Sequence, residues 1–189
     1  MQWNKKEILS IPNLLSFMRI LLIPAFVYSY VTAAEPKDYL IAAGIILLSG
    51  LTDLVDGKIA RRYHMITEFG KALDPIADKL TQAGIVLSLL FKIKYMYLLV
   101  ILFIIKELYM GISCLILLRR GKKLNGAKWY GKVCTAVLYI VMFLLIAIPG
   151  MPAFLQNTLM LVCAGFMLLS IGMYLPVFIK MYLSSQKRL

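Results

Sequence analysis

Four aspartates stand close together in a chain that is otherwise strongly apolar. They are Asp53, Asp56, Asp74 and Asp78, within the run TDLVDGKIARRYHMITEFGKALDPIADKL, and the whole chain has only nine acidic residues. The first two are three residues apart and the last two are four apart, so on helices each pair projects from one face. The segment between the pairs is short, which predicts two antiparallel neighbouring helices whose carboxylates face one another.

Carboxylates that converge in apolar surroundings need a positive charge beside them, because like charges repel strongly where water is excluded. Oxygen ligands without Cys or His suit hard cations such as Mg²⁺, Mn²⁺ or Ca²⁺, and they do not suit Zn²⁺. In the alternative, the aspartates pair with nearby basic residues at helix ends, namely Lys58, Arg61, Arg62, Lys71 and Lys79. The repeated same-face spacing on two consecutive helices favours the metal.

Small and basic residues beside the aspartates indicate a phosphate-containing ligand. Gly57 and Gly70 let the backbone approach a ligand closely, and Ala60 lies one turn beyond Asp56. Arg61 has a planar fork that suits phosphate oxygens, and the N–H groups at the start of the second helix favour a phosphate. We therefore expect a pyrophosphate or a nucleotide beside the metal.

The rest of the chain predicts the membrane helices that position this segment. Hydrophobic residues make up 61% of the chain and the mean hydropathy is +0.83, whereas soluble domains are about 45–50% apolar. Six apolar runs approach the length that crosses a bilayer, although charged residues shorten the second and third. The expected spans are Leu14–Val31, Tyr39–Leu54, Pro75–Phe91, Met96–Leu118, Val133–Ile148 and Phe154–Tyr182.

The fold prediction is an all-α polytopic membrane protein in which residues 1–189 form one domain. A short N-terminal interfacial helix is expected before the six transmembrane helices, with Trp3 and Ile8 in the headgroup region. No linker is long enough to hold a further domain.

Basic residues predict how the chain is oriented. With the N-terminus inside, most Lys and Arg residues fall in inner segments, and the outer loops hold only Lys37, Lys92 and Lys94. The positive-inside rule then places both termini and the aspartate segment at the cytoplasmic face of the cell membrane. The net charge of +12 is explained by loops that favour anionic headgroups, so no nucleic-acid partner is expected.

The aspartate segment resembles the signature of the CDP-alcohol phosphatidyltransferases. The pattern D-x-x-D-G-x-x-A-R, eight residues, then G-x-x-x-D-x-x-x-D holds all eight fixed positions of that signature. The six-span topology also resembles the family, so the likeness covers nearly the whole chain. The resemblance implies that an acceptor hydroxyl attacks the β-phosphoryl group of a CDP-linked lipid and that CMP leaves. It also implies Mg²⁺ or Mn²⁺ as cofactor and a homodimer.

The resemblance further implies roles for the residues at the matching positions. Asp53, Asp56 and Asp74 would be metal ligands, and Asp78 would complete the metal site and act as general base. A carboxylate base suits phosphoryl transfer, which depends mainly on positioning and electrostatic stabilisation. The residues expected to bind the CDP-lipid are Asn13, Gly57, Ala60, Arg61, Thr67 and Gly70.

The acceptor is predicted from runs outside the signature. IPNLLSFMRI and DPIADKL resemble the phosphatidylglycerophosphate synthases, whose acceptor is glycerol 3-phosphate, and DPIADKL also resembles the cardiolipin synthases. The residues expected to bind the acceptor are Arg19, Lys106, Arg119 and Lys132, with pairing to Glu107 as the alternative role of Lys106.

Two departures from the glycerol-phosphate branch bear on this prediction. Those relatives often have Arg-Glu where this chain has Lys106-Glu107. They often have Gly-Lys-x-Lys-Thr where this chain has a single lysine, Lys132. Glycerol 3-phosphate is the first expectation, phosphatidylglycerol the second, and other alcohols, including serine and inositol, the third.

A divalent-cation transporter is the alternative from another class, because intramembrane carboxylates also form ion pathways. Transporters place such sites near the bilayer midplane and often contain internal repeats. Here the aspartates lie near the cytoplasmic ends of two helices, and the sequence has no visible repeat. A transferase is therefore the favoured interpretation.

Overall fold

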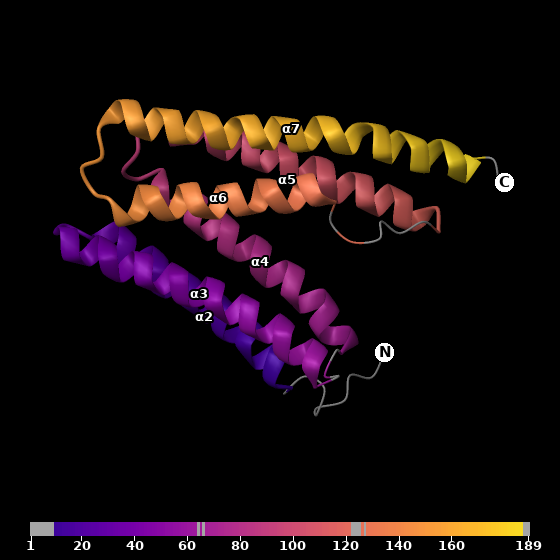
Figure 1. Cartoon of the computed structure of the whole chain (residues 1–189), viewed down its shortest axis with the longest axis horizontal. Helices are drawn as coiled ribbons and strands as arrows, with labels where there is room; N and C mark the ends of the chain where they lie inside the picture. Colours follow the sequence, from indigo (N-terminus) through magenta and orange to yellow (C-terminus); the bar gives the residue numbers. More distant parts are fainter. Residues whose placement is uncertain (1–9, 64, 66, 122–125, 127, 187–189) are drawn as a thin grey trace. The chain divides into compact units, whose positions relative to one another are not determined.

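A computed structural model describes residues 10–63, 65, 67–121, 126 and 128–186, apart from the side chains of residues 54, 61, 68, 185 and 186. The described residues form helices and no strand (Figure 1), which confirms the all-α prediction. The helices are α2 (Ile11–Thr32), α3 (Pro36–Arg62), α4 (Glu68–Leu89), α5 (Met96–Arg119), α6 (Trp129–Ala147) and α7 (Ala153–Gln186). The predicted interfacial helix falls on residues 1–9, outside the described residues.

Five of these helices are long and apolar enough to cross a membrane, namely α2, α3, α5, α6 and α7. This confirms a polytopic membrane protein. Helix α4 is not in that group, and it contains the charged residues Lys71, Asp74, Asp78 and Lys79. Its role as a sixth span stays a prediction.

Local sequence explains where the first helices begin. Pro12 stands in the first turn of α2, and Pro36 is the first residue of α3. Proline suits these positions because its missing N–H would have no partner there. Asp38 Oδ2 accepts hydrogen bonds from the N–H groups of Ala34 at 3.0 Å and Glu35 at 2.9 Å. These bonds stabilise the start of α3 just after the α2–α3 connection.

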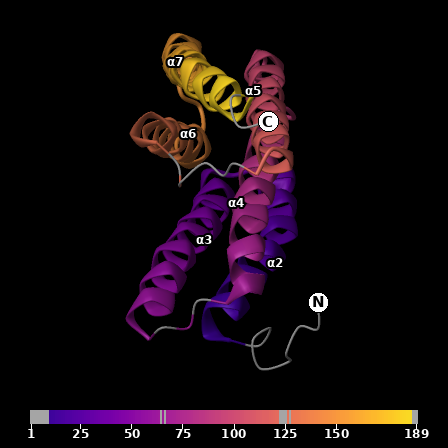
Figure 2. The same cartoon turned by 90° about the vertical axis from the view of Figure 1, so that its right-hand side faces the viewer.

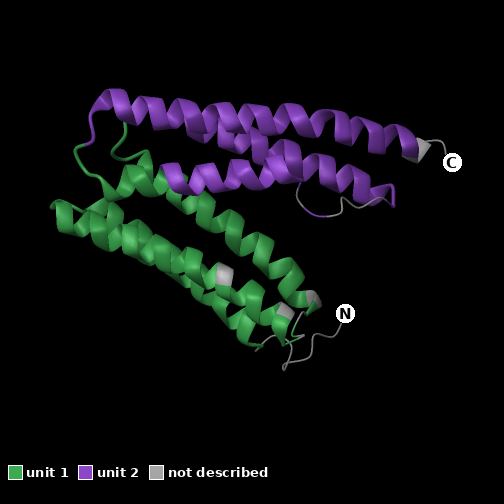
Figure 3. Ribbon diagram, in the orientation of Figure 1, with its two compact units in different colours: residues 1–93, 142–150 green, residues 94–141, 151–189 purple. Residues whose placement is uncertain are grey.

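The chain divides into two compact units (Figure 3). Unit 1 contains residues 1–93 and 142–150, and unit 2 contains residues 94–141 and 151–189. All four aspartates belong to unit 1. The prediction of a single domain over residues 1–189 stays a prediction.

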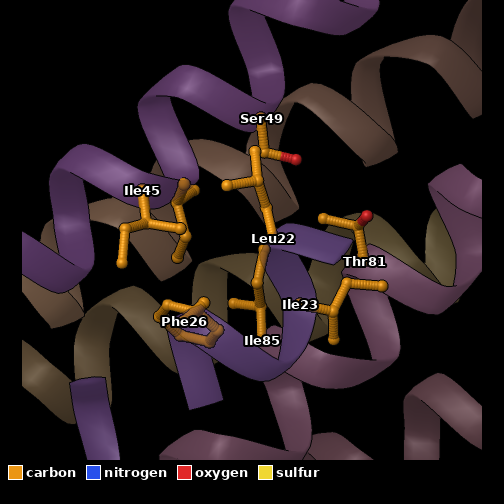
Figure 4. A pocket seen from close by; sticks show the side chains of 8 residues that line it. Leu22, Ile23, Phe26, Ile45, Ser49, Thr81 and Ile85 are labelled. Atoms are coloured by element: carbon orange, nitrogen blue, oxygen red, sulfur yellow. The ribbon is translucent and has the colours of Figure 1, made fainter. Parts of the chain in front are cut away.

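In unit 1, helix α2 packs against both α3 and α4 (Figures 1 and 2). The two aspartate helices were predicted to be direct neighbours, but the closest packing of each is with α2. Figure 4 shows the apolar interior where side chains of the three helices meet around a cavity of about 10 Å³. That volume holds about one water molecule, so a nucleotide or lipid headgroup cannot bind there. The labelled lining residues are Leu22, Ile23, Phe26, Ile45, Ser49, Thr81 and Ile85.

Two contacts hold α4 close to α2 away from the aspartates. A Cβ atom at Gly84 would lie 2.7 Å from Cγ2 of Ile23, so the missing side chain allows the helices to approach. At the end of α4, Lys92 Nζ donates to the carbonyl of Ala33 at 2.5 Å and to Tyr39 Oη at 3.0 Å. The α2–α3 connection is thereby joined to the end of α4.

In unit 2, α5 packs against α7. Leu117, Tyr130, Tyr174 and Phe178 form a buried cluster, and Tyr174 Oη accepts a hydrogen bond from the backbone N–H of Lys128 at 3.0 Å. These aromatic contacts fix the start of α6 against α7.

The close approach at Gly84 is testable. We expect Gly84→Ala to lower the thermal unfolding midpoint of the purified protein, because the new methyl group forces apart α2 and α4 at a cost of about 1–3 kcal/mol. Gly50→Ala is the control, since no heavy atom lies within 4 Å of its added Cβ and alanine is the better helix former. Equal loss of stability in the two variants would contradict the described α2–α4 packing.

Candidate functional site

One face of α2 bears three polar side chains that reach the aspartate segment. Asn13, Ser16 and Arg19 are three residues apart, so they follow one another along the helix. Each residue is at most 1% exposed, and buried polar groups need partners. Their partners lie on α3 and around α4, so this polar face of α2 connects the two aspartate helices.

Arg19 is the charged residue of this face. Its Nη1 lies 2.5 Å from Asp53 Oδ1, and its Nη2 donates a hydrogen bond to Asp56 Oδ2. The side chains of Arg19 and Asp56 are 2% and 6% exposed, whereas that of Asp53 is 50% exposed. A buried charge is tolerated when it is paired, so Arg19 compensates part of the negative charge of α3. Asp53 alone of the three is open to solvent.

The aspartates of α4 have hydrogen-bond partners of their own. Ser16 Oγ donates to Asp74 Oδ1 at 2.7 Å, and Gln82 Nε2 donates to Asp78 Oδ2 at 2.9 Å. Gln82 is 1% exposed, so it holds the Asp78 carboxylate from the buried side. Asp74 and Asp78 both lie close enough to Asp53 for their charges to repel it. The acidic groups of the two helices therefore share one region of unit 1.

The start of α4 is organised by Thr67, its N-cap residue. Thr67 Oγ1 accepts the N–H of Gly70 at 2.9 Å and also accepts from Asn13 Nδ2 at 3.2 Å. A Cβ atom at Gly70 would lie 2.5 Å from Asn13 Oδ1, so a larger residue here would require the Asn13 side chain to shift. The sequence suggested that the N–H groups here favour a phosphate, but that of Gly70 is already used by the cap.

The other residues predicted to bind the CDP-lipid lie at the end of α3. Gly57 and Ala60 are half-buried helix residues one and four positions after Asp56. Arg61 lies in the same helix, but its side chain is outside the described part of the chain. The binding role of all three stays a prediction.

Three of the residues predicted to bind the acceptor belong to unit 2, whereas the aspartates belong to unit 1. Lys106 is buried and its Nζ lies 2.7 Å from Glu107 Oε1, which is the pairing expected as its alternative role. Arg119, the last residue of α5, and Lys132, in α6, are both exposed. Their contact with an acceptor stays a prediction. Arg19 is the fourth predicted acceptor residue, and it lies against Asp53 and Asp56 instead of being free for a substrate.

Sequence reasoning missed Ser16 and Gln82, and it did not foresee the partners of Arg19. A signal was present for each. Asn13, Ser16 and Arg19 recur every three residues in an apolar run, which predicts one polar helix face. Gln82 stands four residues after Asp78, which is hydrogen-bonding distance on a helix.

The aspartates fit a divalent cation in the chemistry of their donors. All are carboxylate oxygens, the ligands that Mg²⁺ and Mn²⁺ prefer, and Asp53 is open to solvent. Among the residues that the structure describes, no three acidic, His or Cys side chains are arranged around a single ion. Instead, Arg19 contacts two of the proposed ligands.

The comparison with known families decides the wider assignment. Residues 9–177 match the sequence profile of a family described as CDP-alcohol phosphatidyltransferase. This chain belongs to that family. The match includes the polar face of α2, the eight signature positions and most of α7, and it confirms the predicted family and transferase class.

Individual relatives support the same assignment. A protein of Rickettsia bellii named CDP-diacylglycerol–glycerol-3-phosphate 3-phosphatidyltransferase is 40% identical over 83 residues, 44% of this chain and 45% of the relative. A probable phosphatidylglycerophosphate synthase of Mycobacterium tuberculosis is 33% identical over 138 residues, 71% of this chain and 64% of the relative. A probable cardiolipin synthase (CMP-forming) of Drosophila melanogaster is 38% identical over 87 residues, 46% of this chain and 26% of the relative. The matched segments thus span less than two thirds of each relative.

The packing of Asn13 against Gly70 predicts a coupling between them. We expect Gly70→Ala to lower the thermal unfolding midpoint, because its methyl group would meet the Asn13 side chain. The double variant Asn13→Ala/Gly70→Ala removes the closest contact and leaves only the approach of the methyl group to Thr67 Oγ1 at 3.1 Å, so the combined loss should be smaller than the sum of the two single losses. Thermal unfolding of the four proteins tests this. Additive losses would show that the two residues do not touch.

Proposed function

We propose that this protein is an integral-membrane phosphatidyltransferase that moves a phosphatidyl group from CDP-diacylglycerol to an alcohol acceptor and releases CMP. The observation that carries the proposal is the complete eight-position signature, whose aspartates lie in one region of unit 1. Glycerol 3-phosphate is the favoured acceptor, giving phosphatidylglycerophosphate. The names of the Rickettsia and Mycobacterium relatives support this choice.

In this reaction an acceptor oxygen forms a bond to the β-phosphorus, and the bond from that phosphorus to the oxygen of CMP breaks. Asp78 accepts the proton of the acceptor hydroxyl, and the hydrogen bond from Gln82 orients its carboxylate. The hydrogen bond from Ser16 orients Asp74 in the same way.

Asp53, Asp56 and Asp74, completed by Asp78, are the residues that would hold Mg²⁺ or Mn²⁺. When bound there, the cation would neutralise charge on the pyrophosphate and on the leaving CMP. The cation would reach the site from solvent at Asp53, since the Asp53 side chain is 50% exposed.

The CDP-lipid is proposed to bind beside the aspartates. The residues assigned to it are Asn13, Gly57, Ala60, Arg61, Thr67 and Gly70. Those assigned to the acceptor are Arg19, Lys106, Arg119 and Lys132. The lipid tails would remain in the bilayer while the headgroup reacts at the membrane surface, because the helices expose apolar side chains such as Leu21 and Leu40.

The site is proposed to face the cytoplasm, with both termini on the same side of the cell membrane. The distribution of Lys and Arg supports this orientation. A homodimer is proposed as the assembly, and membrane lipids and substrates are the expected partners.

Cardiolipin synthesis, with phosphatidylglycerol as the acceptor, is the second candidate. The cardiolipin synthase name of the Drosophila relative favours it, as does the absence of the second lysine after Lys132. A cation transporter is the third and explains none of Gly57, Ala60 and Arg61.

An assay of CMP release tests the proposal. Purified protein is incubated with CDP-diacylglycerol, Mg²⁺ or Mn²⁺, and each of glycerol 3-phosphate, phosphatidylglycerol, serine and inositol. We expect release with glycerol 3-phosphate. Release with phosphatidylglycerol alone would establish the second candidate, and no release with any acceptor would refute the transferase.

The same assay tests the aspartates of α4. We expect Asp74→Asn to abolish turnover and Asp78→Asn to lower kcat by about 10²–10⁴-fold, the usual contribution of a general base. Full activity in either variant would refute the role given to that residue. Lys180→Ala, an exposed change on α7, is the control and should leave turnover intact.

The proposed contact of Lys132 with the acceptor can be tested by measuring KM for glycerol 3-phosphate. We expect Lys132→Ala to raise KM for glycerol 3-phosphate about tenfold, because an ammonium–phosphate contact would be lost, and to leave KM for CDP-diacylglycerol unchanged. Lys180→Ala is again the matched control. An unchanged KM for glycerol 3-phosphate would remove Lys132 from the acceptor pocket.

A further inference from the structure

A positive charge already stands against the aspartates of α3. Arg19 comes from a different helix, is buried, and contacts both Asp53 and Asp56. Its Nε has no hydrogen-bond partner within the described part of the chain, so both carboxylates are held by the end of the guanidinium group alone. A divalent cation bound to the same carboxylates would face that group at short range, where little water screens the repulsion.

We propose that Arg19 is the resident counter-ion of the aspartate site and that it exchanges with the divalent cation when the cation binds. The proposal rests on the proposed function, because it takes Asp53 and Asp56 as metal ligands. Without the cation, Arg19 compensates two carboxylates that would otherwise repel each other. With the cation, at least one contact of Arg19 must break, so Arg19 weakens cation binding.

The exchange leaves the backbone of α2 in place. Asn13 remains bound to Thr67 and Ser16 to Asp74, so only the long side chain of Arg19 needs to move. The freed guanidinium stays beside the site, and its planar fork matches phosphate oxygens. A phosphate-bearing substrate that pairs with it favours the cation-bound arrangement. Substrate and cation should therefore strengthen each other's binding, and Arg19 can contact a phosphate only after the exchange.

Direct measurement of Mn²⁺ binding tests the exchange without any lipid substrate. Free Mn²⁺ is followed by electron paramagnetic resonance during titration of purified wild-type protein and of Arg19→Gln. We expect Arg19→Gln to bind Mn²⁺ about tenfold to a hundredfold more tightly, since the opposing charge is gone. Lys37→Gln removes the same charge from an exposed position at the other end of α3 and should bind Mn²⁺ like the wild type.

Arg19→Lys provides a second variant that keeps the charge. An ammonium group cannot contact two carboxylates as a planar fork does. We therefore expect Arg19→Lys to bind Mn²⁺ about threefold more tightly than the wild type, a smaller gain than in Arg19→Gln. Size-exclusion chromatography and thermal unfolding establish that each variant is folded. If Arg19→Gln does not fold, the Mn²⁺ affinity of Arg19→Lys alone tests the exchange.

Unchanged or weaker Mn²⁺ binding in the folded variants overturns the exchange. CMP release by the wild-type protein is measured separately. Release together with unchanged Mn²⁺ affinity in the variants would refute the exchange and leave the proposed function standing. Failure of the wild type to release CMP would refute the proposed function itself.

Discussion

The contact of Arg19 with Asp53 and Asp56 is the interaction around which the polar side chains of unit 1 are arranged. Carboxylates and a guanidinium group placed among apolar helices are each unfavourable alone, and together they compensate one another. The contact fixes which face of α2 meets α3. With that face set, Asn13 and Ser16 point toward α4, where they bind Thr67 and Asp74. The ion pairs of Arg19 and the hydrogen bonds of Asn13 and Ser16 together favour this rotation of α2, the helix that both aspartate helices pack against.

The three helices of unit 1 make apolar contacts along one part of their length and polar contacts along another. Around Phe26 and Ile85 the side chains of the three helices leave a space of only about 10 Å³, so that part is closely packed. At the aspartates the contacts are hydrogen bonds and ion pairs, and Asp53 is open to solvent. The half-exposed carboxylate of Asp53 and its buried partners therefore lie at one end of the helices, and the apolar packing around Phe26 and Ile85 supports that end.

The sequence predicted the features that follow from local periodicity. Four of the apolar runs correspond to helices within four residues at each end, but α3 ends eight residues after its predicted span and α4 begins seven residues before. The three- and four-residue spacings placed each aspartate pair on one helix face. It failed where a contact joins distant segments. Arg19 and Asp56 are 37 positions apart, and nothing in the spacing of α3 reveals a partner on α2. The sequence also did not reveal that α2 is the main neighbour of both α3 and α4, since a short connection does not exclude a third helix beside the two that it joins.

The position of Arg19 also has a consequence for how the protein enters the bilayer. Arg19 lies about 12 Å along α2 from Ile11, at 1.5 Å per residue, and an arginine deep in a single membrane helix costs about 2.5–3.5 kcal/mol on insertion scales. Its acidic partners are synthesised more than thirty residues later, because Asp56 follows at a distance of 37 positions. Until then the charge of the arginine has no partner on α3. The hairpin of α2 and α3, and not α2 alone, is the smallest segment that contains both Arg19 and the carboxylates that compensate its charge.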